Sequence, residues 1–306
     1  MSTEAGPPGS VAPGVPLGSH YLVFELVGAG ATGAVYRGSE RDGGPDLAVK
    51  ILRPELASDP EVVTRFVRER SILLSVTHPN LVTVHDLVME GSTLAIVMDF
   101  VRGGDLRSYL RQSGPLPPSA AAQLVAQVLN ALGAVHARGI VHRDLKPENV
   151  MVDVSNPAAP VARLTDFGIA RIAHGPSFTR LSGLLGTPEY MAPEQADRDE
   201  CGPAADLYAA GILFYELVCG TTPFAGGHPV AVIRAHIDEA PRRPTGMSDT
   251  LWAIVGRLLA KSPEDRPATA AQAAVELRAA AISATRPLPP QPQPQPRPEP
   301  QTVRPE

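Results

Sequence analysis

The chain has 306 residues, of which 43% are hydrophobic, so it can bury a large core in one large or two moderate domains. Its formal net charge of −5, without a basic stripe, argues against nucleic acid as a main partner. No apolar run reaches the ~18 residues of a membrane span, and two cysteines are too few for a disulfide framework or a zinc site. We therefore expect a cytoplasmic protein.

The two ends of the chain differ in composition from the rest. Residues 1–19 are small, polar and rich in Gly and Pro, without the basic start and apolar stretch of a signal peptide, so we expect a disordered leader. Residues 286–306 alternate proline with glutamine and charge, which favours extended polyproline II. We expect a disordered, solvated tail there, and a docking site for a proline-reading partner is the alternative.

Residues 20–101 predict a small lobe built mainly of strands. Short apolar or alternating runs broken by turns place the strands at residues 21–27, 34–37, 47–52, 81–88 and 94–99, with a hairpin turn at 41–46. One helix interrupts them, because Asp59-Pro60-Glu61 supplies a capping residue, a proline in the first turn and a nearby acid.

After Gly103-Gly104 the pattern changes to helix. Apolar residues at helical spacing predict helices at residues 118–138, 204–218, 249–260 and 269–281, bounded by Pro and Gly. The expected fold class is therefore α+β, with a small antiparallel-sheet lobe over 20–101, a larger helical lobe over 102–283 and a hinge near 99–104. Ligands prefer such domain interfaces.

Most of the chemistry is concentrated in two segments: His142-Arg143-Asp144-Leu145-Lys146-Pro147-Glu148-Asn149 and Asp166-Phe167-Gly168. Asp144 can accept a proton from a substrate hydroxyl, and Lys146 can neutralise a moving phosphoryl group. Asn149 and Asp166 offer the hard oxygen ligands that Mg²⁺ prefers. Together the two segments can manage a triphosphate, its metal ions and a hydroxyl nucleophile.

A glycine-rich segment, Gly-Ala-Gly-Ala-Thr-Gly-Ala-Val at residues 28–35, lies between two expected strands. A dinucleotide fold shares this glycine spacing but requires a helix directly after the glycines. A Walker loop would need Gly-Lys-Ser/Thr, which is absent. We therefore interpret the segment as glycine-flanked strands that close over phosphates, with backbone N–H groups free of Cβ obstruction.

Lysine is scarce: of the 27 lysine and arginine residues, only Lys50, Lys146 and Lys261 are lysine. A lysine is a compact point charge on a flexible stem, whereas an arginine is a planar fork. Because this chain uses arginine wherever a generic cation is sufficient, we interpret Lys50 and Lys146 as positions that require the compact charge.

These segments resemble the motifs of protein kinases over roughly residues 21–281, in particular those of the bacterial eukaryotic-like (Hanks-type) serine/threonine kinases. The resemblance implies a bilobal protein-kinase fold that transfers the γ-phosphoryl group of ATP to Ser or Thr hydroxyls of protein substrates, with Mg²⁺ or Mn²⁺. It implies catalytic roles for Asp144, Lys146, Lys50 and Glu69, and metal ligands at Asn149 and Asp166. The implied ATP site comprises Gly28, Ala29, Gly30, Gly33, Val35, Ala48, Lys50, Met98, Asp99, Val101, Asp105 and Met151.

Within that resemblance, Lys50 matches the strand lysine that holds the phosphates and pairs with a helix glutamate. Ala48 shares its strand face, and a surface lysine on an edge strand is the alternative. Glu69 is the expected partner, because it lies on the apolar-facing side of the helix. Glu61 is nearer, but it lies in the first turn, where an acid is expected for dipole reasons alone.

The stretch Met98-Asp99-Phe100-Val101 resembles a gatekeeper and hinge, whose backbone would bond adenine. Asp105 matches a ribose contact, or it caps the next helix. Met151 matches the floor under adenine, or it is ordinary core.

The segment after Asp166 resembles an activation loop. Its hydroxyls Ser177, Thr179 and Ser182 are the candidate phosphorylation sites, with autophosphorylation expected. Arg143 could dock a phosphate there and so order the segment. The resemblance also places Thr187 on the substrate-side loop, bonded to Asp144 and Lys146.

Three further residues have structural roles by resemblance: Asp206 would hold the catalytic-loop backbone, and Glu194 and Arg266 would form a buried ion pair. Some relatives dimerise through the small lobe, so a homodimer is one expected partner. Two other classes stay open: a pseudokinase scaffold on the same fold, and a small-molecule phosphotransferase. We expect the chain to be either a naturally soluble kinase or a fragment of a membrane-anchored one.

Overall fold

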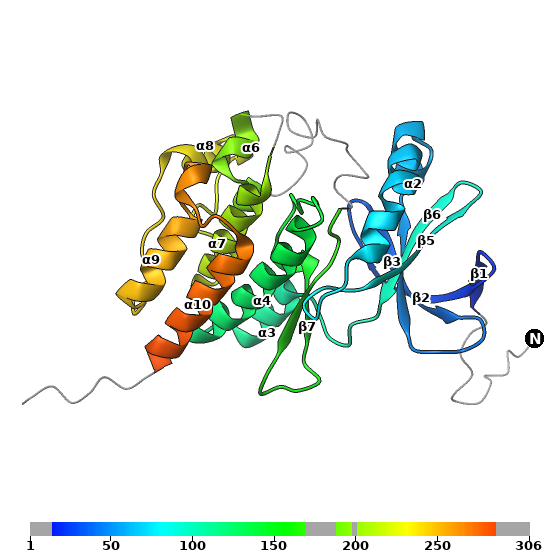
Figure 1. The fold of residues 1–306 in the computed structure, drawn as a ribbon, viewed down its shortest axis with the longest axis horizontal. Helices are drawn as coiled ribbons and strands as arrows, with labels where there is room; N and C mark the ends of the chain where they lie inside the picture. The colour runs from blue at the N-terminus through cyan, green and yellow to red at the C-terminus, as the bar shows by residue number, and fades with distance from the viewer. Residues whose placement is uncertain (1–13, 169–187, 198–200, 286–306) are drawn as a thin grey trace, which may run out of the picture.

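The computed structural model describes residues 14–168, 188–197 and 201–285. It has two lobes, with the sheet and its helices at one end and a mostly helical lobe at the other (Figure 1). This confirms the α+β fold with two lobes that the sequence predicts.

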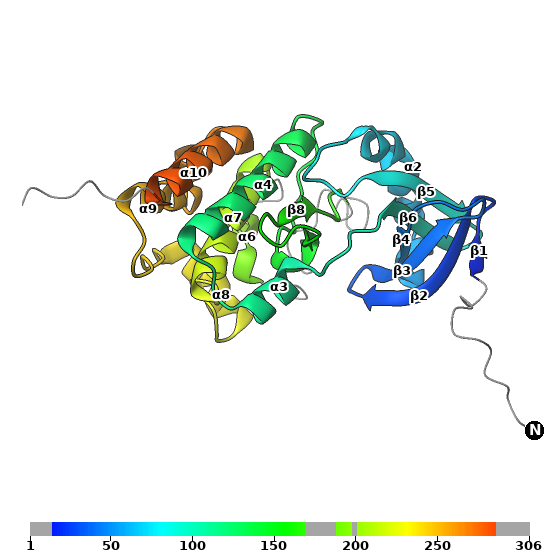
Figure 2. The same ribbon diagram turned by 90° about the horizontal axis from the view of Figure 1, so that it is seen from below.

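The N-terminal lobe is a six-stranded antiparallel sheet in the order β1-β2-β3-β4-β6-β5 (Figure 2). Its elements are β1 (Val15–Leu17), β2 (Tyr21–Ala29), β3 (Gly33–Glu40), β4 (Leu47–Leu52), α1 (Pro54–Ala57), α2 (Pro60–Ser75), β5 (Val84–Glu90) and β6 (Thr93–Asp99). The carboxylate of Asp59 caps α2 by accepting from the backbone N–H of Glu61 at 2.8 Å. As the helical spacing predicts, Phe66, Glu69 and Leu73 are buried on one face of α2.

The C-terminal lobe is built around two central helices. Its elements are α3 (Leu106–Ser113), α4 (Pro118–His136), β7 (Val150–Asp153), β8 (Val161–Leu164), α6 (Pro193–Asp197), α7 (Pro203–Cys219), α8 (Pro229–Asp238), α9 (Asp249–Leu258) and α10 (Ala270–Thr285). Helix α4 packs against α7 and α10, and most residues of α4 and α7 are buried, as expected of helices that are apolar nearly all round. In the described ranges, no helix is both long and apolar enough to cross a membrane.

Strand β1 corrects the expectation of a disordered leader for residues 15–17. It pairs antiparallel with β2 at the edge of the sheet, with Leu17 opposite Tyr21. Only Leu17 is buried, while Val15 is exposed. Pro16 is tolerated because an edge strand does not need every N–H. A strand with a single buried side chain leaves too little pattern for the sequence to indicate.

The expected strand at residues 81–88 begins later than predicted, at Val84. Leu81 instead forms an isolated bridge to Leu164, and the N–H of Val82 donates to the carbonyl of Leu164 at 2.9 Å. The apolar run at 81–84 therefore divides into two parts. Leu81 and Val82 contact Leu164 of the large lobe, and Val84 begins strand β5. Helix α8 was not among the expected helices, and α3 was expected only as the helix that Asp105 could cap, because both are short and carry several polar residues.

Candidate active site

The loop between α4 and β7 gathers three of the predicted side chains around one carboxylate. The ammonium of Lys146 lies 3.0 and 2.7 Å from the two carboxylate oxygens of Asp144. The amide nitrogen of Asn149 donates to Asp144 Oδ2 at 3.1 Å and to the Asp144 carbonyl at 2.7 Å. Asp144 is half exposed. A substrate hydroxyl can therefore approach an oriented carboxylate.

Asp206, at the start of α7, holds the backbone of this loop. Its Oδ2 and Oδ1 accept from the N–H groups of His142 and Arg143, each at 2.8 Å, and His136 Nε2 lies 2.7 Å from Oδ2. The Asp206 side chain is buried. Arg143 has a φ of 67°, a left-handed conformation that non-glycine residues seldom adopt, so these bonds support strained backbone.

Thr165 joins the Asp144 loop to Asp166. His142 Nε2 lies 3.0 Å from the Thr165 carbonyl, and the Thr165 N–H donates to the Asn149 carbonyl at 2.9 Å. The next residue, Asp166, also has a positive φ, of 62°. Two segments separated in sequence are thus fixed side by side through the main chain of Thr165.

Lys50 reaches this site from the other lobe. It is buried in β4, and its ammonium lies 2.6 Å from Asp166 Oδ2. The ion pair that the structure gives Lys50 is therefore with Asp166. Glu69, the partner expected from the sequence, is buried on the inner face of α2.

The glycine-rich segment forms the end of β2, a tight connection and the start of β3. A Cβ on Gly33 would lie 2.1 Å from the Ile51 carbonyl, so close packing of β3 on β4 requires glycine there. By contrast, a Cβ on Gly28 would meet no atom within 4 Å. The Arg53 guanidinium donates to the Gly30 carbonyl at 3.0 Å and holds the connection in place. The open space above Gly28 fits the close approach of a phosphate.

Five residues predicted to surround adenine belong to one hydrophobic cluster: Val35, Ala48, Met98, Val101 and Met151. Strand register explains part of this grouping, because Ala48 pairs with Met98 across β4 and β6, and Val35 pairs with Lys50 across β3 and β4. An apolar wall therefore lies next to the buried ammonium, as a nucleotide with an apolar base and charged phosphates requires.

The side chain of Asp99, in the hinge, is hydrogen-bonded within the small lobe. His85 Nε2 lies 2.7 Å from Asp99 Oδ1, and the Thr83 N–H donates to Oδ2 at 3.2 Å. Burial raises the pKa of Asp99, but the bonds from His85 and Thr83 outweigh it and hold the pKa below its usual value. An adenine contact at this position would therefore come from the backbone.

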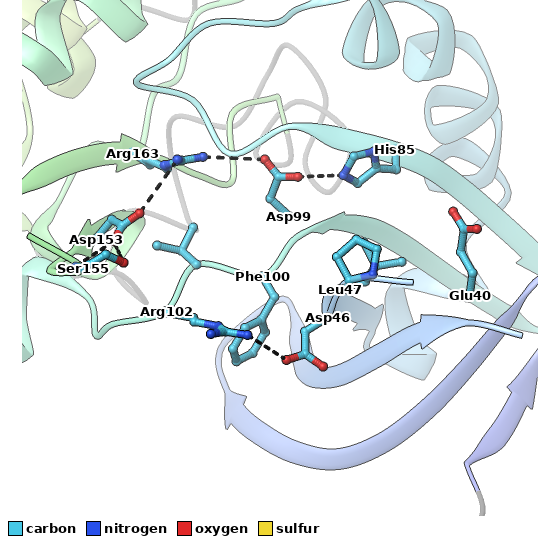
Figure 3. Close-up of a pocket in the computed structure, with 12 residues that line it drawn as sticks. Glu40, Asp46, Leu47, His85, Asp99, Phe100, Arg102, Asp153, Ser155 and Arg163 are labelled. Atoms are coloured by element: carbon cyan, nitrogen blue, oxygen red, sulfur yellow. Dashed lines mark hydrogen bonds and ion pairs between the residues drawn. The ribbon is translucent and has the colours of Figure 1, made fainter. Parts of the chain in front are cut away.

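A pocket of about 400 Å³ lies beside the hinge, between the lobes. Figure 3 shows Asp99 between His85 and Arg163, and Arg102 directed at Asp46. The Arg163 guanidinium lies 3.8 Å from both Asp99 and Asp153, so it links the hinge to the β7–β8 hairpin. The pocket meets the apolar cluster predicted to hold adenine at Val101, and most of its other lining residues are charged or polar.

Asp105 caps helix α3, as one of its two predicted roles requires. Its Oδ1 accepts from the Ser108 N–H at 2.6 Å. Asp105 also forms an isolated bridge with Met151, which lies in β7 and is partly buried against the main core. The ribose and adenine contacts of these two residues stay predictions.

The donor set suits a metal ion that is shared with phosphates. The side-chain nitrogen of Asn149 donates to Asp144, so its side-chain oxygen is left for other contacts. Asp166 uses only one of its carboxylate oxygens for Lys50. Within the described ranges, no group of three or more His, Cys, Asp or Glu could hold a metal unaided. Mg²⁺ commonly takes one or two protein oxygens together with phosphate oxygens and water, which fits these two residues.

The ion pair predicted between Glu194 and Arg266 is present in the large lobe. Arg266 donates to both carboxylate oxygens of Glu194 at 2.6 and 2.8 Å, and to the carbonyls of Ala204, Ala260 and Lys261. The Arg266 side chain is 0% exposed. This pair fixes α6, which follows the substrate-side segment, to the rest of the lobe.

Four predicted residues lie outside the described ranges: Ser177, Thr179, Ser182 and Thr187.

The sequence interpretation missed Arg107, Glu148 and Glu216 as a connected group. Arg107 lies in the first turn of α3, where a cation opposes the helix dipole, and Glu216 is a lone acid in an apolar stretch of α7. A cation in the first turn of a helix and an acid within an apolar helix are both visible in the sequence. They could have identified Arg107 and Glu216 as candidates.

Two lobes that bring Lys50, Asp166 and the Asp144 loop to one place define the protein kinase class. The protein kinase domain family matches residues 21–277, which is most of the chain. The chain therefore belongs to the protein kinase family, and members of this family use ATP and a divalent metal.

Similar proteins narrow the class to bacterial Hanks-type serine/threonine protein kinases, as the motifs predict. The chain is 50% identical to serine/threonine-protein kinase PkaA of Streptomyces coelicolor over 82% of its length, and 38% identical to PknB of Mycobacterium leprae over 85%. The solved kinase domain of PknI from Mycobacterium tuberculosis has a TM-score of 0.67 at 28% identity, covering 89% of this chain and 100% of that one. The chain spans 48% of the length of PkaA and 43% of PknB.

Proposed function

We propose that this chain transfers the γ-phosphoryl group of ATP to Ser and Thr hydroxyls of proteins. One observation carries the proposal. Lys50 pairs with Asp166, and Thr165, the residue before Asp166, is bonded to the loop that holds Asp144, Lys146 and Asn149. Phosphoryl transfer needs little covalent chemistry from the protein, so positioning and charge stabilisation supply most of the acceleration.

Asp144 orients the acceptor hydroxyl and takes its proton. Lys146, bonded to both oxygens of Asp144, keeps that carboxylate in place and offsets negative charge on the transferred group. Because the side-chain amide nitrogen of Asn149 donates to the same carboxylate, its side-chain oxygen would be left to hold a metal ion together with Asp166. A divalent metal ion held by Asn149 and Asp166 would supply positive charge against the phosphates.

Lys50 changes partners when the nucleotide binds. In the structure its ammonium is paired with Asp166, the same carboxylate proposed to hold the metal. In the proposed complex, Lys50 contacts the α and β phosphates and pairs with Glu69, which frees Asp166. The burial of Glu69 on the same face of α2 as Phe66 and Leu73 supports this exchange, because that face is turned towards the interior of the small lobe.

Regulation by the segment that resembles an activation loop belongs to the same proposal. Phosphate on Thr179 or Ser182 would dock on Arg143, whose backbone Asp206 fixes next to Asp144. A homodimer through the small lobe belongs to the same proposal, and Leu26, Val27 and Met89 are exposed apolar side chains of that lobe. The proline tail is proposed as a docking segment, and the cytoplasm as the location.

Incubating the protein with Mg²⁺ and γ-labelled ATP, alone and with peptides that offer Ser, Thr or Tyr, tests the proposal. We expect label on Ser and Thr peptides and on the protein itself, at Thr179 or Ser182 in phosphosite mapping. The double variant Thr179→Ala/Ser182→Ala should transfer more slowly to peptide. A wild-type protein that labels neither the Ser and Thr peptides nor itself would remove the proposed function. Undiminished transfer by the double variant would remove only the switch.

A further inference from the structure

Arg107 connects three separate parts of the large lobe. From α3 its Nε donates to Glu148 at 2.8 Å, in the short turn that ends the Asp144 loop. Its Nη2 donates to the hydroxyl of Tyr190 at 2.7 Å, and its Nη1 bonds to Glu216 in α7. The Tyr190 hydroxyl in turn donates to Glu216. One guanidinium thus joins two carboxylates and a phenol from three elements.

The contacts of Arg107 with Glu216 and Tyr190 are shielded from water. Glu216 and Tyr190 are buried, and the Arg107 side chain is only 24% exposed. Burial and the Glu216 carboxylate raise the pKa of Tyr190 well above its usual value, so the phenol stays protonated and donates to Glu216. The planar fork of arginine can serve three acceptors at once, which a lysine ammonium on its single stem cannot match in geometry.

Tyr190 is the link to the acceptor. It ends the 3-10 turn Pro188–Tyr190, in the segment that follows the activation-loop region and precedes α6. Arg107 therefore connects this turn to Glu148, which stands between Lys146 and Asn149. A rigid connection here would fix the distance between the turn and the catalytic carboxylate.

We propose that Arg107 is a positioning residue for the protein acceptor: by holding Tyr190 against Glu216 and Glu148, it keeps the Pro188–Tyr190 turn in register with Asp144. The inference rests on the proposed kinase function. It concerns the acceptor and not the nucleotide, because Arg107 makes none of its contacts with Lys50, Asp166 or the glycine segment.

Two mild variants test this inference, since removing the whole guanidinium would strand the buried Glu216. Arg107→Lys keeps the charge but loses the fork, and Tyr190→Phe removes one hydroxyl. Each should raise KM for a Ser/Thr peptide about tenfold, the effect of losing one charge-assisted hydrogen bond, with KM for ATP changed less than about twofold. The double variant should be less impaired than the product of the singles, because both break one connection.

Arg111→Ala is the matched control, because Arg111 lies on the same helix, is exposed and bonds only to Ser108 among the contacts the structure gives it. It should change neither KM. Unaltered peptide KM in both mild variants, or an equal rise in KM for ATP, would overturn the inference. An inactive wild-type protein would instead count against the proposed function, so the two failures are distinguishable.

Discussion

Asp144→Asn is expected to lower the rate of phosphoryl transfer by ~10²–10⁴, the usual contribution of a general base. Asparagine has nearly the same shape and keeps a carbonyl oxygen for Lys146 and Asn149, but it cannot take the proton of the acceptor hydroxyl. Because Asp144 is half exposed, the fold should be unaffected. Initial rates of peptide labelling at saturating ATP, with circular dichroism of both proteins, measure the effect.

Asp42→Asn supplies the control for this substitution, because Asp42 is an exposed residue in the connection between β3 and β4. It removes the same charge in the other lobe and should leave the rate unchanged. If Asp144→Asn retained more than about a tenth of the wild-type rate, Asp144 would not be the base.

Arg266→Met is expected to lower the free energy of unfolding by ~3–5 kcal/mol. The substitution leaves the buried carboxylate of Glu194 without its guanidinium, and three backbone carbonyls lose their donor. The loss is large because a buried charge is left without a partner. It is a substantial fraction of the total stability of a domain, which is only ~5–15 kcal/mol. Urea unfolding followed by tryptophan fluorescence from Trp252, in α9, would measure it.

Arg234→Met gives the matched comparison. Arg234 pairs with Asp238 on the surface of α8, and both side chains are exposed, at 83% and 55%. Such pairs contribute ~0–1 kcal/mol. Equal losses of stability in the two variants would contradict a special role for the buried pair.

The sequence predicts those parts of the fold whose signal is local. Asp59-Pro60-Glu61 marks the start of α2, because capping depends on a few adjacent residues. Strand β4 occupies residues 47–52 as expected, because its apolar run is bounded by turns. The grouping of Asp144, Lys146 and Asn149 follows from their spacing within one loop.

Long-range pairings that the family resemblance did not supply escaped the prediction. The partner of Lys50 depends on how the two lobes and α2 are arranged, and Asp166 is 116 positions away in the chain. Arg107 reaches Tyr190 and Glu216 only after α3, α7 and the turn between them have packed. Strand β1 forms because β2 presents a free edge, which residues 15–17 do not reveal by themselves.

The most direct test of the account is a structure of the protein with Mg²⁺ and a non-hydrolysable ATP analogue. We expect the analogue between the lobes, with Lys50 moved from Asp166 to the phosphates, and with Asp166 and Asn149 on the metal ion. A complex in which the analogue binds elsewhere, while Lys50 and Asp166 stay paired as they are now, would contradict the convergence of these residues on a single nucleotide.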